Sequence, residues 1–87
     1  MEKVQEIMHI LPDVERLAQL AEEAAELAQA ALKLRRVLDG TNVTPVAYQT
    51  AVDNLVEEIS DVALCVEVCG LKADESVMSK KVERAIT

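Results

Sequence analysis

The sequence predicts an all-α protein built around an antiparallel helical hairpin with short flanking helices. Three observations indicate this fold. Good helix formers such as Ala, Leu, Glu, Lys and Arg are prominent, and the 87 residues include only two Gly and two Pro. These few helix breakers divide the chain into two long and two short segments, and each long segment carries apolar residues at helical spacing. A chain of this length is expected to form one domain, residues 1–87.

The first two helices are delimited by proline and glycine. A short helix is expected at about residues 2–10, because Pro12 interrupts it and is tolerated only in the first turn of the helix that follows. The segment 14–38 contains no breaker. Asp39-Gly40 ends it, since Gly readily takes the left-handed conformation that closes a helix.

The last two helices have clear start signals. Thr44 predicts an N-cap hydroxyl, Pro45 suits the first helical position, and the helix can continue to residue 69, where Gly70 stops it. A shorter fourth helix is expected from Asp74, whose carboxylate can accept hydrogen bonds from the first free amides.

Apolar residues in both long segments recur at alternating steps of three and four, the spacing of a seam packed against another helix. Two such helices joined by a short connection are expected to pack side by side in opposite directions. The predicted seam of the first comprises Leu17, Leu20, Ala24, Leu27, Ala31, Leu34 and Leu38. That of the second comprises Val52, Leu55, Ile59, Val62, Val66 and Cys69.

Two pairs of acidic residues lie on or beside these apolar faces. On a helical wheel Glu58 falls inside the apolar arc of its helix, and Asp61 lies beside it one turn later. Glu23 occupies the corresponding arc of the other long helix, and Glu26 lies at its border. Carboxylates are costly on a packing face, so these four are candidates for a functional site.

The two acidic pairs are expected to meet across the helix pair. Glu26 precedes Gly40 by 14 residues and Glu58 follows Thr44 by 14 residues, so each lies roughly 21 Å from the bend at 1.5 Å per residue. Carboxylates gathered in a partly desolvated crevice repel one another and require a cation. Oxygen ligands without His or Cys suit Mg2+, or Mn2+, and these ions also bind phosphate oxygens.

The charge balance restricts the partners further. Sixteen acidic residues against nine basic ones give a formal net charge of −7, which disfavours nucleic acid polymers and anionic membranes. No apolar stretch approaches the roughly 18 residues of a membrane span, and the first residues do not form a signal peptide. We therefore expect a cytoplasmic protein and a small phosphate-containing ligand held through metal ions.

The residues around both acidic pairs resemble the motifs of a known family. Residues 20–27 (LAEEAAEL) and 57–62 (EEISDV) are similar to the EExxE and ExxD motifs of the MazG-like all-α nucleoside triphosphate pyrophosphohydrolase superfamily. The resemblance covers the two long helices, about half of the chain. It implies Mg2+-dependent cleavage between the α- and β-phosphates of a nucleoside triphosphate, giving the monophosphate and pyrophosphate, as in housecleaning of nucleotide pools.

The resemblance also implies roles for individual acids. Glu23, Glu26, Glu58 and Asp61 match the family's metal ligands. Glu22, the leading acid of the first motif, is the candidate catalytic group that orients or deprotonates the attacking water.

Near the C-terminus, Lys81-Val82-Glu83-Arg84 is similar to the family's late basic segment, which approaches the phosphates. Lys81 and Arg84 are therefore candidate phosphate-binding residues, although basic residues near a helix end equally complement the helix dipole. The family often has Asn just after this segment, where this chain has Ala85. The resemblance further implies a homodimer or homotetramer with a four-helix-bundle-type core, and a composition poor in large side chains favours the same assembly.

Other interpretations of the sequence remain open. A non-catalytic helical oligomerisation or partner-binding module could keep the metal cage as a structural element. Glu6 and His9 have the ExxH spacing of ferritin-like di-iron sites, but in a short segment before the proline. Cys65 and Cys69 are expected to be reduced core thiols, because a zinc site would need two further soft ligands.

Overall fold

The computed structural model describes residues 2–41 and 47–86. Within these ranges the chain forms four α-helices and no strand. The helices are α1 (Glu2–Ile10), α2 (Asp13–Asp39), α3 (Tyr48–Val68) and α4 (Glu75–Ile86). The prediction of an all-helical fold is confirmed.

The predicted ends of α1 and α2 agree with the structure within a residue. Gly40 follows α2 with a φ of 76°, and its N–H donates a hydrogen bond to the carbonyl of Arg36. Thr41 N–H donates to the same carbonyl over 3.1 Å. This left-handed closure leaves Asp39 as the last residue of α2, as the Asp-Gly pair predicts.

The start of α3 differs from the prediction. Thr44 and Pro45, the predicted start signal, lie outside the described residues, and the helix begins only at Tyr48. Ala47 precedes it with an extended backbone (φ −57°, ψ 138°) and no side-chain cap, so the predicted helical position 47 is wrong. At the other end, Gly70 takes a φ of 74° after Cys69.

The predicted cap of α4 is present. Asp74 Oδ1 accepts hydrogen bonds from the N–H groups of Ser76 (2.9 Å) and Val77 (3.1 Å) and from the Ser76 hydroxyl (2.7 Å). These bonds satisfy two of the amides that a helix leaves free at its N-terminus. The side chain of Asp74 therefore fixes where α4 begins.

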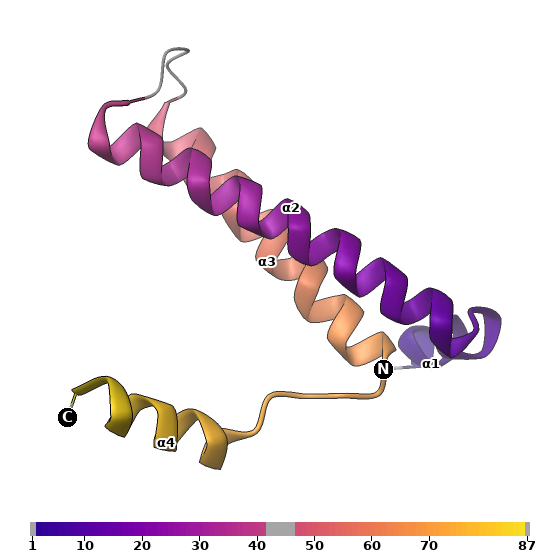
Figure 1. Ribbon diagram of the computed structural model, residues 1–87. Coiled ribbons are helices and arrows are strands. Elements are labelled where there is room, and N and C mark those ends of the chain that lie inside the picture. Colours follow the sequence, from indigo (N-terminus) through magenta and orange to yellow (C-terminus); the bar gives the residue numbers. More distant parts are fainter. Residues whose placement is uncertain (1, 42–46, 87) are drawn as a thin grey trace.

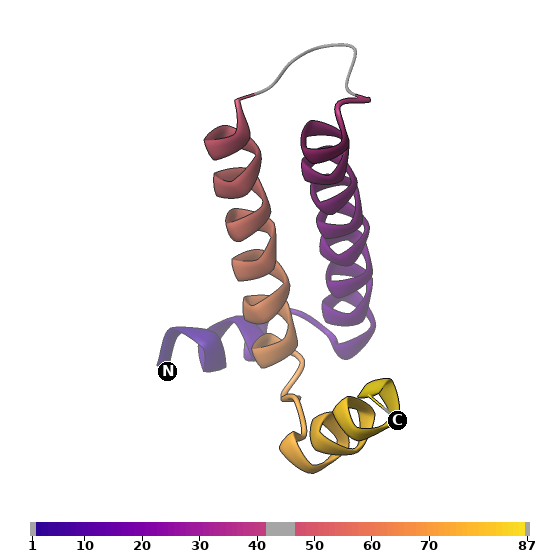
Figure 2. The ribbon, with the colours of Figure 1, turned by 90° about the vertical axis from the view of Figure 1, so that its left-hand side faces the viewer.

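Helices α2 and α3 lie side by side along most of their length and run in opposite directions (Figures 1 and 2). Helix α1 crosses beneath them and contacts α3. Arg16, at the start of α2, holds the end of α1: its guanidinium donates to the carbonyl of Met8 over 2.7 Å and forms an ion pair with Asp13.

The seam between α2 and α3 is shifted relative to the predicted one. Four predicted seam residues of α2 and one of α3 are exposed, with exposed fractions of 53% for Leu17, 68% for Leu38 and 50% for Ile59. On α2, the seam is formed by the residues that are at least half-buried, which are Arg16, Leu20, Glu23, Leu27, Ala30, Leu34 and Val37. On α3 the at least half-buried residues are Ala51, Val52, Leu55, Glu58, Asp61, Val62, Cys65, Val66 and Val68, and Cys69 directly after the helix is half-buried too. Each helix therefore places a glutamate in its packing seam.

Little of the chain is fully enclosed. Among the described residues only Val4, Ala51 and Val68 are buried, and every described side chain of α4 is exposed. Figure 1 shows α4 apart from the α2/α3 pair. The total accessible surface is 6990 Å², whereas a compact monomer of this mass exposes about 5000 Å². No helix in the described part of the chain is sufficiently long and apolar to cross a membrane.

Candidate metal centre

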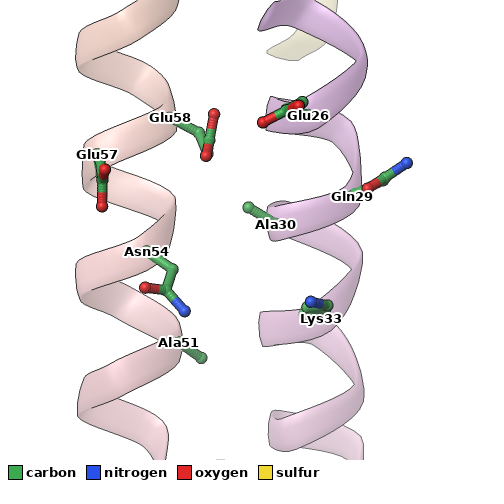
Figure 3. Close-up of a pocket in the computed structure, with 8 residues that line it drawn as sticks. All are labelled: Glu26, Gln29, Ala30, Lys33, Ala51, Asn54, Glu57 and Glu58. Atoms are coloured by element: carbon green, nitrogen blue, oxygen red, sulfur yellow. The ribbon is translucent and has the colours of Figure 1, made fainter.

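Three carboxylates converge between the two long helices. Glu23 and Glu26 are one turn apart on α2, and Glu58 approaches them from α3. One oxygen of each lies within 4.8 Å of one oxygen of the other two. Figure 3 shows Glu26 and Glu58 directed toward each other across the gap between the helices. The sequence prediction that acids from both helices meet at this level is thus matched by three of the four residues.

The arrangement suits a hard divalent cation. A Mg2+ ion with ligands at about 2.1 Å keeps its ligand oxygens no more than roughly 4.2 Å apart, and the 4.8 Å within which these three oxygens lie is of that order. Oxygen Oε2 of Glu58 is buried and has no hydrogen-bond partner within the described ranges. A buried carboxylate oxygen without a partner is unfavourable, and a metal ion or its bound water would satisfy it. The residues present therefore fit Mg2+ or Mn2+.

The mutual repulsion of the acids changes their protonation equilibria. Partial desolvation raises the pKa of Glu58, and the negative charges of Glu26, Asp61, Glu23 and Glu57 raise it further. Desolvation likewise raises the pKa of Glu23, followed by the charges of Asp61, Glu26 and Glu22. Both shifts mean that the cluster resists carrying its full negative charge.

Asp61 and Glu22 lie beside the three converging carboxylates rather than among them. Asp61 is half-buried on α3, one turn after Glu58, and its charge acts on both Glu23 and Glu58. It is therefore near the cluster but outside the group whose oxygens approach within 4.8 Å. Glu22 is exposed on α2, where a side chain can reach solvent next to the cluster.

The two predicted phosphate-binding residues occupy another part of the molecule. Lys81 and Arg84 are exposed on α4, which lies beyond the C-terminal end of α3 and apart from the helix pair (Figure 1). Within one chain the structure thus does not bring α4 beside the carboxylates.

The other candidate ligands remain separate from the cluster. Glu6 and His9 are exposed on α1 and belong to no group of potential metal ligands in the described part of the chain. Cys65 and Cys69 are half-buried free thiols of the seam. Desolvation, with the charge of Glu23 next, raises the pKa of Cys65 and disfavours the thiolate that soft metals bind.

A cavity of about 230 Å³ adjoins the cluster and was not predicted from the sequence. Glu26, Glu57 and Glu58 form its acidic end, and Ala30 and Ala51 form its walls between the helices. Asn54, Gln29 and Lys33 complete the lining. The sequence signal for this cavity is a small residue at a seam position of each helix, Ala30 in α2 and Ala51 in α3. Small side chains at these positions leave space between the helices.

Comparisons of the chain with protein-family models, with curated proteins and with solved structures give no match. The fold and the geometry of the site therefore carry the functional argument.

Proposed function

We propose that this protein is a Mg2+-dependent nucleoside triphosphate pyrophosphohydrolase. The observation that carries the proposal is the convergence of Glu23, Glu26 and Glu58 from two helices, with one buried Glu58 oxygen left without a partner in the described structure. Hard cations held by carboxylates bind phosphate oxygens as their remaining ligands. The EExxE and ExxD resemblance of the same residues selects cleavage between the α- and β-phosphates.

The proposed reaction assigns the acids different tasks. Glu23, Glu26 and Glu58 would hold Mg2+, with Asp61 as a further ligand. The bound ion supplies charge neutralisation for the phosphates and acidifies water in the site. Glu22 orients the attacking water and accepts its proton. The water oxygen bonds to the α-phosphorus, while the bond from that phosphorus to the bridging oxygen breaks and pyrophosphate leaves with the electron pair.

We also propose that the antiparallel α2/α3 hairpin is half of a four-helix-type core in a homodimer or homotetramer. The chain exposes roughly 2000 Å² more surface than expected for a compact monomer of its mass. Large apolar side chains on the outer faces of both helices contribute to this surface, including Leu17, Leu32, Val56 and Ile59. Interfaces of stable homodimers bury areas of this order.

The experiment is a panel of nucleoside triphosphates, with canonical, oxidised and deaminated bases, incubated with the protein and Mg2+ or Mn2+. Pyrophosphate release that disappears in Glu58→Gln is the expected result. Glu67→Gln, on the outward face of α3, is the matched control that should keep activity. Orthophosphate as the primary product would contradict the proposed cleavage position.

A non-catalytic module is the second candidate, and the position of α4 favours it. If Lys81 and Arg84 never approach the carboxylates, the metal cage serves only to join the helices. This alternative predicts that Mg2+ raises the melting temperature while no triphosphate in the panel is consumed. Glu22→Gln further distinguishes the enzyme from the non-catalytic module. In the enzyme, it should reduce turnover and leave Mg2+ binding unchanged.

A further inference from the structure

The cavity beside the carboxylates has a charge at each end. Its acidic end is formed by Glu26 and Glu58, the proposed metal ligands. Lys33 lies two helical turns further along α2, roughly 10 Å from Glu26 along the axis at 1.5 Å per residue. Among the described residues that line the cavity, Lys33 is the one cation. Figure 3 shows both residues on the stretch of α2 that borders the cavity.

Lys33 has no structural partner that explains its place. Its side chain makes neither a hydrogen bond nor an ion pair with any residue of the described ranges. The side chain of Asn54 is likewise without a hydrogen bond in those ranges, and its amide lies at the edge of α3 that faces α2 (Figure 3). Both groups are therefore available to a ligand. Gln29 also lines the cavity, but its side chain points away from α3 (Figure 3).

The walls exclude some ligand chemistries. None of the described residues that line the cavity is aromatic, and Ala30 and Ala51 provide small apolar side chains. Such walls give a nucleobase nothing to stack on. The volume of about 230 Å³ is below the roughly 300–1000 Å³ of sites that enclose a whole small-molecule ligand. The space thus suits a compact, oxygen-rich anion better than a complete nucleotide.

We propose that this cavity binds the pyrophosphate portion of the substrate, with Lys33 and Asn54 as its protein contacts opposite the metal ions. The inference rests on the proposed function and assigns a further residue to it. A lysine ammonium is a compact point charge that binds phosphate from variable directions. Placed here, it neutralises the charge that pyrophosphate gains as it leaves, in a chain whose overall charge of −7 opposes that step.

Calorimetric titration of the full-length, Mg2+-loaded protein with pyrophosphate tests the proposal without turnover. Lys33→Met should weaken pyrophosphate binding roughly tenfold to hundredfold, the range of a lost charge-assisted hydrogen bond. Lys33→Arg should retain most of the affinity. Arg35→Met, which removes the same charge from an exposed position of the same helix, is the matched control and should bind like wild type.

A second pair of variants tests the space rather than the charge. Ala51→Leu would occupy the cavity and should reduce pyrophosphate binding while Mg2+ binding and helix content persist. Ala73→Leu adds the same bulk at an exposed position between α3 and α4 and should have no effect. Should Ala51→Leu fail to fold, the Lys33 series decides the question alone.

Three results would overturn the proposal: no pyrophosphate binding by the Mg2+-loaded wild type, equal losses in Lys33→Met and Arg35→Met, or a Lys33→Met effect confined to nucleoside monophosphate. The last would place the nucleoside in the cavity. Failure of the proposed function is distinguishable, because pyrophosphate binding that depends on Lys33 would stand even if no triphosphate were cleaved. If triphosphates are cleaved but Lys33→Met does not change pyrophosphate binding, the proposed activity stands and the proposed pyrophosphate site is refuted.

Discussion

Replacing Glu58 with Gln should separate the stability of the helices from the stability that Mg2+ adds. The substitution keeps the shape of the side chain and removes one of the three converging carboxylates. Without Mg2+, the variant should melt at or above the wild-type temperature, since the repulsion that raises the pKa of Glu58 is relieved. With Mg2+, the wild type should gain stability that the variant largely lacks.

The magnitude follows from linkage between binding and folding. At a Mg2+ concentration one hundred times its Kd, binding to the folded state alone stabilises the wild type by about 2.7 kcal/mol. Loss of one metal ligand is expected to weaken binding at least as much as the roughly 10–100-fold loss seen for supporting residues. At the same Mg2+ concentration the gain then falls to about 0.4–1.4 kcal/mol. In a domain of this size each kcal/mol shifts the melting temperature by roughly 4–8 °C.

The assay is thermal unfolding followed by circular dichroism, with Mg2+ titrated into wild type, Glu58→Gln and Glu67→Gln. Glu67 is exposed on the same helix, so its substitution changes the net charge equally without touching the cluster. The expected order is a large Mg2+ shift for wild type and Glu67→Gln and a small one for Glu58→Gln. Equal Mg2+ shifts in all three proteins would refute the metal centre.

Three further predictions concern the cluster and the helix ends. Asp61→Asn should weaken Mg2+ binding less than Glu58→Gln does, since Asp61 lies outside the converging group; calorimetry that gives it the larger loss would make Asp61 a principal ligand. The pKa values of Glu23 and Glu58 are raised in the folded state above their ordinary value of 4.5. A raised carboxyl pKa contributes stability that is present below the unfolded value and is lost as the pH rises. The metal-free protein should therefore melt at a higher temperature as the pH falls from 7 toward 4.5. This rise should shrink in Glu58→Gln, and an unchanged slope there would contradict its assignment to the cluster. Gly40→Ala should cost about 1 kcal/mol through left-handed strain alone, because an added Cβ meets nothing within 4 Å; denaturant unfolding that shows no loss would contradict the cap.

Local chemistry predicted the helices well. Pro12 and Gly40 delimit α2, and Asp74 caps α4, because proline geometry, left-handed glycine and side-chain capping act within a few residues. The start of α3 was less predictable. A threonine followed by proline is a start signal, yet the chain at Ala47 is still extended and the helix begins at Tyr48. Such signals compete with the geometry of the connection, which local sequence does not determine.

The level along the helices at which Glu26 and Glu58 lie was predictable, but the side chains that face the other helix were not. Counting residues from the bend placed Glu26 and Glu58 at one level, because helical rise is nearly constant. The cavity and the role of Lys33 depend on which side chains leave space between the helices. That follows from the register of packing, and an apolar pattern that covers most of each helix leaves the register open.

The register itself supports a function that needs charge at the interface. Helix α3 has Ile59 next to Glu58, yet the isoleucine is half exposed and the glutamate lies in the seam. Helix α2 likewise exposes Leu17 and places Glu23 inward. The observed register is favourable if a cation sits among the acids and the outward apolar stripes are covered by a second copy. Metal binding and assembly would then stabilise the same register, and each should strengthen the other.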